Sequence, residues 1–442
     1  MIESQPVSLS LPSQPGAATS NAGATPAAER SHARRAVVAA AIGNGLEMYD
    51  FTVYSFFAAT IGRLFFPSTS PLASLMLSFA TFGAGFVMRP LGAVLIGHFA
   101  DRRGRKAALT LTIGLMTAGT ALIAFAPTHA SIGLAATALV VLGRLLQGLS
   151  AGGEIGAASA LLMESASKQK RCFLVSWQGA TQGGAALAGA LTGAAITATL
   201  SPEAMMSWGW RIPFMIGLLI APVGFYIRRN LKETHVSGAE HADLKTVFRQ
   251  YWRVLLLGML LMTGSTSGMY ITVFYMPTYL IQSIHMPPVT AFLAACMAGL
   301  AMLVMSPIFG RLADRMPTRK PIIVAAALAS LAWCYPNFLL LTTHATLVSV
   351  VLQIGVSVTI MSISGGAGAA MMMEAFPREH RATGMAVMYS LGVTVFGGFA
   401  PLIVTWLIAA TGSSMAPAWY LMTASTISLI ALTLFPSHPG RD

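Results

Sequence analysis

The sequence predicts an all-α integral membrane protein in which twelve helices cross the bilayer. Of its 442 residues, 55% are hydrophobic and only 10% are charged, whereas soluble domains carry roughly a quarter charged residues. The apolar residues fall in long blocks, and the run 107–126 contains no charge. A bilayer core of about 30 Å needs about 20 apolar residues in a helix. Because the blocks do not alternate apolar with polar residues, they predict helices rather than the strands of a membrane barrel.

The apolar blocks fall into two groups of six spans. The first group is expected at 36–62, 72–100, 107–127, 131–163, 172–200 and 210–227, and the second at 254–283, 288–310, 321–342, 346–374, 383–411 and 417–435. The fourth and seventh spans are the longest, so we expect them to tilt or to extend beyond the lipid. The domain organisation that follows is a disordered cytoplasmic tail at 1–35, a six-helix bundle at 36–227, a cytoplasmic linker at 228–253, a second six-helix bundle at 254–435 and a cytoplasmic tail at 436–442.

Basic residues are concentrated in the tails, the linker and every second loop between the spans. Of the 27 Lys and Arg residues, all but four lie in the tails, the linker and the alternate loops that begin with 101–106. The four are Arg63 and Arg211 near the opposite loops, and Arg89 and Arg144 inside spans. Because cytoplasmic loops are rich in Lys and Arg, we expect both termini in the cytoplasm and the spans in a bacterial inner membrane. The net charge of +12 therefore reflects topology and does not indicate nucleic-acid binding.

A loop motif occurs once in each half. Gly97-x3-Asp101-Arg102-x-Gly104-Arg105-Lys106 follows the second span, and Gly310-x3-Asp314-Arg315 follows the eighth without the inner glycine. Glycine lets two helices approach closely, and an aspartate can cap the N-terminus of the next helix. The arginines can reach carboxylates or lipid phosphates. We therefore predict a cytoplasmic gate; the alternative is a basic loop that only sets topology. The predicted gate residues are Gly97, Asp101, Arg102, Gly104, Arg105, Asp314 and Arg315.

These motifs resemble the major facilitator superfamily, whose second motif is similar to Arg144-Leu145-Leu146-Gln147-Gly148. More narrowly, four segments resemble the metabolite:proton symporter family: NGLEMYDF (44–51), FVMRPLG (86–92), SAGGE (150–154) and WGWRIPF (208–214). Within it, ASLML (73–77) and ITVFYMPTY (271–279) look most like the citrate and tricarballylate carriers. The resemblance implies two pseudo-symmetric six-helix bundles, alternating access, and a substrate site between the repeats near the midplane. The loop 311–320 departs from the family pattern.

Five charged residues lie inside spans of the first half: Glu47, Asp50, Arg89, Arg144 and Glu154. Each costs about 2.5–3.5 kcal/mol at a helix centre, so they must pair or face water. Glu47 and Asp50 are three residues apart and share a helix face, so their repulsion favours a proton on one of them. We predict that Asp50, Glu47 and Glu154 couple transport to protons, with Arg144 as the counter-charge. The alternative is that these acids and arginines form structural ion pairs.

The same spans contain candidates for substrate binding. Arg89 and Arg144 carry planar, permanently charged guanidinium groups that suit carboxylates. Gln178 and Gln182 form a polar stripe in the fifth span, and Tyr270 and Tyr275 supply hydroxyls in the seventh. For these four residues the alternative is hydrogen bonding between helices or to the backbone.

The function predicted from these residues and this resemblance is secondary active transport. The leading hypothesis is proton-coupled uptake of a small carboxylate such as citrate or tricarballylate. The alternatives are a non-transporting sensor on the same scaffold, or a symporter for another organic acid or a zwitterion. We expect no enzyme activity, since no HExxH signature occurs and the glycines of the GxSxG-like run 148–152 lie inside an apolar span, where they belong to helix packing. We expect no metal site, since the three cysteines show no ligand spacing. We expect a monomer among lipids that is driven by the proton gradient without a cofactor.

Overall fold

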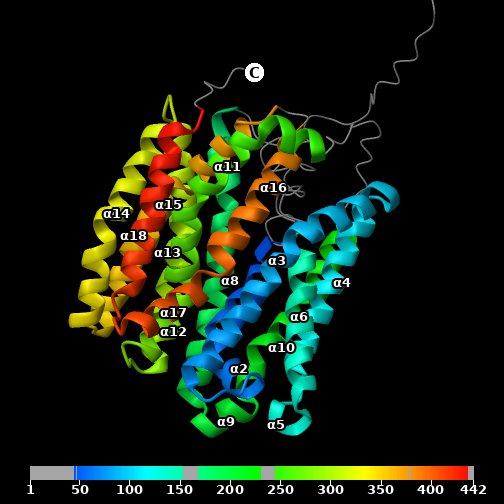
Figure 1. The fold of residues 1–442 in the computed structure, drawn as a ribbon, viewed down its shortest axis with the longest axis vertical. Helices are drawn as coiled ribbons and strands as arrows, with labels where there is room; N and C mark the ends of the chain where they lie inside the picture. The colour runs from blue at the N-terminus through cyan, green and yellow to red at the C-terminus, as the bar shows by residue number, and fades with distance from the viewer. Residues whose placement is uncertain (1–43, 46, 153–167, 230–243, 378–379, 437–442) are drawn as a thin grey trace, which may run out of the picture.

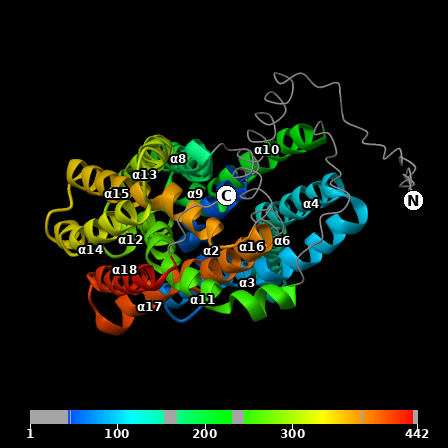
Figure 2. The same cartoon turned by 90° about the horizontal axis from the view of Figure 1, so that it is seen from above.

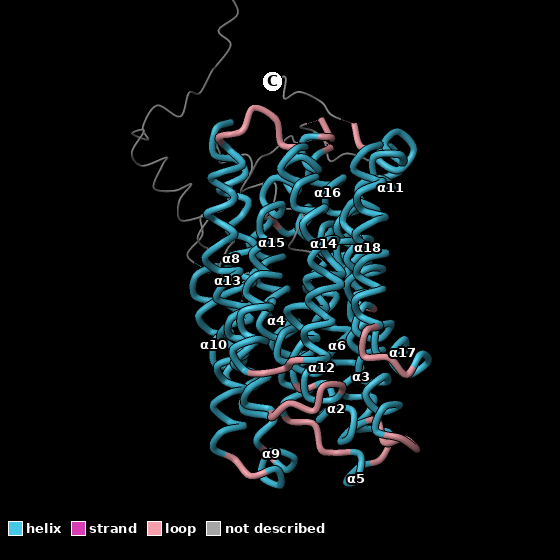
Figure 3. Tube along the Cα trace, turned by 90° about the vertical axis from the view of Figure 1, so that its left-hand side faces the viewer, coloured by secondary structure: helices cyan, strands magenta, loops and turns pink. Residues whose placement is uncertain are grey.

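The computed structural model describes residues 44–45, 47–152, 168–229, 244–377 and 380–436. Within these ranges the chain is helical, with short turns and no strand, and the helices run along the long axis of the molecule (Figures 1 and 3). The first half contains the helical residues 47–56, α2 (Ala58–Phe65), α3 (Pro71–Arg103), α4 (Arg105–Ala124), α5 (His129–Ile132), α6 (Leu134–Gly152), α8 (Arg171–Thr199), α9 (Pro202–Ser207) and α10 (Ile212–Arg229). The second half contains α11 (Leu244–Met269), η3 (Tyr270–Tyr275), α12 (Met276–Gln282), α13 (Pro288–Asp314), α14 (Lys320–Thr343), α15 (Leu347–Glu374), α16 (Arg381–Val393), η4 (Thr394–Gly398), α17 (Ala400–Thr411) and α18 (Ala416–Leu434).

The twelve-helix prediction is confirmed. Nine spans within the described ranges are long and apolar enough to cross a membrane. The other three are the first helix, which is interrupted at Phe57, the Gly- and Ala-rich α8, and α10, whose apolar stretch is shorter. The seventh span begins at Leu244 rather than at residue 254, and non-helical backbone at Tyr251 separates its first turns from the rest. Part of the linker predicted at 228–253 is therefore helical, and its residues 230–243 lie outside the described ranges.

The two halves lie side by side: from the side and from above, α3, α4, α6 and α10 of the first half lie on one side, and α13, α14, α15 and α18 of the second half, yellow-green to red, lie on the other (Figures 1 and 2). Along one line α8 packs against α13 through glycines on both helices. A Cβ on Gly183 would lie 2.5 Å from the backbone nitrogen of Leu303, and one on Gly299 would lie 2.4 Å from that of Leu187. Along a second line α3 packs against α16, η4 and α17. Close backbone packing therefore holds the halves together at two seams.

The seventh and eleventh spans each contain a π-helical segment, η3 and η4. Segment η4 packs against α3, and Tyr270 of η3 contacts the rings of Phe82 and Phe86 on α3. The Thr394 hydroxyl donates to the Phe86 carbonyl at 2.8 Å, and a Cβ on Gly398 would lie 2.6 Å from the Phe86 ring. π-helical turns are rare and concentrate at functional sites, because the widened turn displaces backbone groups and side chains. Both segments face the part of α3 that carries Arg89.

One end of the molecule, at the top of Figure 1, is called here the basic end. There α3 and α13 finish, and α8, α14 and α16 begin. Lys and Arg residues gather at this end; those with described side chains include Arg102, Arg103, Lys106, Lys170, Arg171, Arg311, Arg315, Arg319, Lys320 and Arg381.

Glycines also set the distance between α3 and α6. A Cβ on Gly148 would lie 1.7 Å from the Gly85 carbonyl oxygen, and one on Gly152 would lie 1.9 Å from the Arg89 oxygen. A Cβ on Gly92 would lie 2.0 Å from the Leu149 oxygen. The two backbones are thus in direct contact, which places the arginines of both helices close to the first helix.

We predict that Gly148→Ala destabilises the protein. The methyl group would force α3 and α6 apart, and overpacking of this kind costs about 1–3 kcal/mol or more. The midpoint of thermal unfolding in detergent should fall by several degrees. The control is Gly114→Ala on α4, where a Cβ would meet no atom within 4 Å and the helix should gain from alanine. Equal midpoints for the two variants would contradict the packing described.

Candidate functional site

Four of the five charged residues predicted inside the first half are described, and all four are buried. Glu47 and Asp50 extend from the first helix and are 4% and 5% exposed, and Arg89 on α3 and Arg144 on α6 are fully buried. Glu154 lies outside the described residues. Four isolated charges in a membrane would cost about 10–14 kcal/mol, so their partners decide whether the site is tolerable.

Glu47 pairs with Arg89. Oε1 of Glu47 lies 3.4 Å from Nη2 of Arg89, which joins the first helix to α3 inside the bundle. Arg89 also stacks on the rings of Phe86 and Phe51, with its guanidinium carbon 4.3 and 4.8 Å from their centres. The charge of Arg89 is therefore balanced by one carboxylate and two aromatic faces.

Asp50 connects to Arg144 through two neutral side chains. Oδ2 of Asp50 accepts a hydrogen bond from the Thr120 hydroxyl of α4 at 2.5 Å. The Gln147 amide donates to the same Thr120 oxygen at 2.9 Å, and Arg144 donates to the Gln147 oxygen at 2.7 Å. Oδ1 of Asp50 has no hydrogen-bond partner among the described residues. Although Glu47 and Asp50 are three residues apart, the structure gives them separate partners on different helices.

Phe51 lies between the two arginines. The guanidinium carbon of Arg144 lies 4.6 Å from the centre of the Phe51 ring, and it also stacks on Tyr54 and Phe82 at 4.4 and 4.9 Å. Nε and Nη1 of Arg89, and Nε and Nη2 of Arg144, are buried without a hydrogen-bond acceptor in the described part of the chain. Both guanidinium groups thus keep donors available beside a shared aromatic ring.

The second half closes over this cluster with Tyr270 of η3. Its ring lies 5.3 Å from that of Phe86 and 6.2 Å from that of Phe82. Tyr270 lies within electrostatic range of Glu47 and both arginines. The structure therefore places this predicted substrate residue beside three of the four charges, Glu47, Arg89 and Arg144.

The other predicted substrate residues are arranged differently. Gln182 lies close to Tyr389 of α16, which places this part of α8 beside the second half within electrostatic range of Arg89. The backbone carbonyl of Gln178 accepts from the Asn44 amide at 3.2 Å. Tyr275 contacts Thr405 of α17, whose hydroxyl lies 3.1 Å from its own. Gln182 thus stays close to the charged cluster, whereas the described bond of the Tyr275 hydroxyl lies within the second half.

Sequence reasoning missed three residues of this site: Thr120, Gln147 and Tyr389. Gln147 belongs to the motif in the fourth span, so a polar side chain one turn from Arg144 was a usable signal. Thr120 and Tyr389 are single polar residues among many in apolar spans, and only the tertiary structure brings them to the charges.

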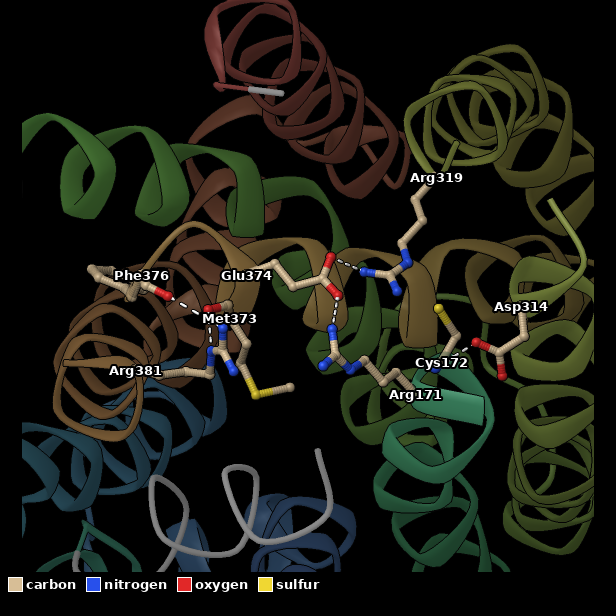
Figure 4. Close-up of polar contacts among 8 residues, drawn as sticks. All are labelled: Arg171, Cys172, Asp314, Arg319, Met373, Glu374, Phe376 and Arg381. Carbon is tan, nitrogen blue, oxygen red and sulfur yellow. Dashed lines mark hydrogen bonds and ion pairs between the residues drawn. The ribbon is translucent and has the colours of Figure 1, made fainter. Parts of the chain in front are cut away.

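The predicted gate residue Asp314 lies at the basic end and caps a helix of the opposite half (Figure 4). Its Oδ1 accepts from the backbone nitrogen of Cys172 and its Oδ2 from that of Phe173, both at 2.9 Å. These are donors in the first turn of α8, where a carboxylate is favoured by the helix dipole. We expected the aspartate to cap the next helix, α14; instead it caps α8, because α13 ends against the beginning of α8.

A second cross-link at the basic end passes through Glu374 at the end of α15 (Figure 4). Its Oε1 accepts from Arg171 of α8 at 3.0 Å, and its Oε2 from Arg319 beside α14. Arg381 of α16 donates to the carbonyls of Met373 and Phe376 at the end of α15. One carboxylate therefore bridges arginines from both halves, a role that the sequence motifs did not indicate for Glu374.

The remaining gate predictions have mixed outcomes. Gly104 has a φ of +89° between α3 and α4, which suits glycine. A Cβ on Gly310 would lie 2.5 Å from Ser176, so close helix approach holds there, but a Cβ on Gly97 would meet nothing within 4 Å. The packing reason for Gly97 was wrong, because no described element lies against that face of α3. Arg102 and Arg315 are exposed, and the side chains of Asp101 and Arg105 lie outside the description.

The chain belongs to the major facilitator superfamily, which its residues 40–391 and 299–442 match. It is therefore a multi-pass membrane transporter rather than an enzyme, and the resemblance inferred from its motifs is confirmed. A citrate-proton symporter of Salmonella typhi is 37% identical over 93% of this chain and 95% of its own length. A proline/betaine transporter of Escherichia coli K12 is 32% identical over 90% of this chain and 82% of its own.

Solved structures support the same fold. The crystal structure of a D-xylose-proton symporter matches with a TM-score of 0.74 at 17% identity, over 92% of this chain and 98% of that one. A partially occluded, inward-open xylose transporter from E. coli matches with a TM-score of 0.75 at 16% identity, over 93% of this chain and 100% of that one.

We predict that Asp314→Asn loosens the basic end. Asparagine removes the negative charge from the N-terminus of α8 and keeps only one accepting oxygen, which weakens the contact by about 1 kcal/mol. Cys172, which is fully buried beside this contact, should then react about fivefold faster with N-ethylmaleimide. Alkylation is measured in a background in which Cys296 and Cys334 are replaced by serine.

The control for this experiment is Glu203→Gln on α9, an exposed acid at the opposite end. Hydrogen bonds from its own backbone nitrogen and from Ser201 lower the pKa of Glu203, so this substitution also removes one negative charge. It should leave the alkylation rate unchanged. An unchanged rate in Asp314→Asn would show that the cap does not keep this end closed.

Proposed function

We propose that the protein is a proton-coupled symporter that takes up a small carboxylate, such as citrate or tricarballylate, across a bacterial inner membrane by alternating access. In this proposal the basic end faces the cytoplasm, where loops rich in Lys and Arg are normally found, and both termini lie on that side. The protein works as a monomer among membrane lipids, needs no cofactor, and is driven by the proton gradient.

The observation that carries the proposal is the pair of buried arginines whose donors find no acceptor in the part of the chain that the structure describes. A buried N–H without an acceptor costs about 1–3 kcal/mol, so Arg89 and Arg144 favour a ligand that supplies acceptors. Carboxylates match guanidinium groups in a planar, two-bonded geometry. Because both arginines stack on Phe51, a molecule with more than one carboxylate could engage both at once. Citrate and tricarballylate have this chemistry.

Proton coupling follows from the connection between Arg144 and Asp50. A substrate carboxylate that binds Arg144 would bring a further negative charge close to Asp50. Like charges disfavour ionisation, so substrate binding favours the protonated form of Asp50. Substrate and proton would then bind together on the outer side and leave together on the inner side, where the proton concentration is lower.

A zwitterion is the competing substrate class, because proline/betaine transporters are also among the relatives. A quaternary ammonium group needs free aromatic faces. The rings nearest the charges, Phe51, Phe82 and Phe86, already stack on the two arginines. This arrangement favours a carboxylate over a betaine.

The test is uptake of labelled citrate into proteoliposomes with and without an inward proton gradient. If one net charge enters with each substrate, about 100 mV supplies about 2.3 kcal/mol, or roughly 50-fold accumulation. Unlabelled tricarballylate should compete and glycine betaine should not. Betaine uptake without citrate uptake would replace the proposed substrate class, and uptake that ignores the gradient would contradict symport.

We further predict that Arg144→Lys lowers the initial rate of citrate uptake by about 10-fold to 100-fold. An ammonium group cannot replace a planar fork that donates to Gln147 and to a carboxylate at the same time. The matched control is Arg63→Lys, the same substitution at an exposed position near the opposite end of the first helix. Equal rates in both variants would contradict a role for Arg144 in the substrate site.

A further inference from the structure

Thr120 occupies an unusual position among the buried groups around Asp50. Its oxygen has three neighbours within hydrogen-bonding distance: Oδ2 of Asp50 at 2.5 Å, the Gln147 amide nitrogen at 2.9 Å and the carbonyl oxygen of Met116 at 3.0 Å. Thr120 is 1% exposed and Gln147 is fully buried, so water does not compete for these contacts. A hydroxyl has one hydrogen to donate and can accept two.

The orientation of Gln147 determines which of these bonds Thr120 accepts. A guanidinium group can only donate, so the Gln147 atom that faces Arg144 at 2.7 Å must be its oxygen. The Gln147 amide nitrogen then faces Thr120 and donates to it. The Thr120 hydrogen is therefore left for one of two acceptors, Asp50 or Met116.

We propose that Thr120 is a positioning residue for proton exchange at Asp50. The Thr120 hydroxyl turns between Oδ2 of Asp50 and the Met116 carbonyl as Asp50 gains and loses its proton. This inference rests on the proposed function, because it assigns to Asp50 the proton that is transported. Neither the sequence motifs nor the names of the relatives assign a role to Thr120.

Both protonation states then give hydrogen-bond partners to Oδ2 of Asp50, to the Thr120 hydroxyl and to the Gln147 amide that faces it. When Asp50 is ionised, Thr120 donates to its Oδ2 and accepts from Gln147. When a proton from outside binds Oδ2, the new O–H donates to Thr120, which accepts a second bond and turns its own hydrogen to the Met116 carbonyl. The transported proton stays on Asp50 and leaves from Asp50, and the proton of Thr120 is retained. Without such an adaptable partner, one of the two states would bury an unsatisfied group.

The other groups around Asp50 do not offer this exchange. Arg144 on α6 is the nearby cation, and Glu47, Tyr49 and Tyr54 are the titratable groups on the helical residues 47–56 around Asp50. From α10, Gly217 approaches Asp50, so that a Cβ there would lie 2.7 Å from Oδ1. Among the described residues packed against the Asp50 carboxylate, Thr120 is its one hydrogen-bond partner.

The experiment is an infrared pH titration of the purified protein without substrate. The carbonyl band of protonated Asp50 is identified as the band that Asp50→Asn removes. Thr120→Val removes the donor to the ionised carboxylate, a charge-assisted bond that is stronger than the bond to the neutral acid. The midpoint of this band should therefore move to higher pH by about one unit. Thr120→Ser restores the hydroxyl and should titrate like the unmodified protein.

The matched control is Thr117→Val on the same helix, since Thr117 forms no side-chain hydrogen bond to the described residues; it should leave the midpoint in place. An unchanged midpoint in Thr120→Val, an equal shift in Thr120→Ser, or the absence of any band removed by Asp50→Asn would overturn the inference. Because the titration contains no citrate, these results are independent of the uptake assay. A failure of citrate transport would thus be distinguishable from a failure of the Thr120 switch.

Discussion

The burial of two acids and two arginines inside one membrane bundle is the constraint on which the rest of the structure depends. Charges at this depth are tolerated only when they are paired or solvated, and the four residues form two acid–arginine pairs that are arranged differently. Glu47 and Arg89 pair directly, whereas Asp50 and Arg144 are joined through Thr120 and Gln147. Among the described residues the cluster is balanced in charge, but donors on both arginines have no acceptor. This combination favours ligand binding over a purely structural role.

The packing of the helices follows from the same constraint. Two arginines from α3 and α6 can share the ring of Phe51 only if these helices lie in direct contact, which the glycines allow. The first helix then supplies both acids to the shared space. The π-helical turns of the seventh and eleventh spans bring the second half against α3 at the same level, with Tyr270 at the edge of the cluster.

Helix α8 connects the basic end to this cluster. Its first turn is capped by Asp314 of the second half, and its middle contacts Asn44 of the first helix and Tyr389 of α16. A helix is stiff over this length, so separation of α8 from α13 at the basic end would move contacts beside the charges. Opening of one end and rearrangement of the site are therefore mechanically linked in the proposed transport cycle.

The sequence was informative where physical chemistry acts locally. Apolar length predicted the spans, and the cost of burying charge in a membrane singled out Glu47, Asp50, Arg89 and Arg144 as site residues. It was less informative where partners come from distant helices. Glu374 carries no local sign that it meets Arg171 and Arg319, and the target of Asp314 could not be deduced from its neighbours in sequence. Thr120 looks like any other threonine in an apolar helix until α4 is placed against the first helix.

The central claim is that the buried cluster couples a proton to a carboxylate through Asp50. The most direct measurement compares gradient-driven accumulation of citrate with citrate counterflow in proteoliposomes that contain Asp50→Asn. The account predicts that accumulation is lost, because the variant cannot exchange a proton, while counterflow is partly retained, because exchange needs no net proton movement. Accumulation of citrate in response to a pH gradient by Asp50→Asn would contradict the account and would direct attention to Glu47 and then Glu154.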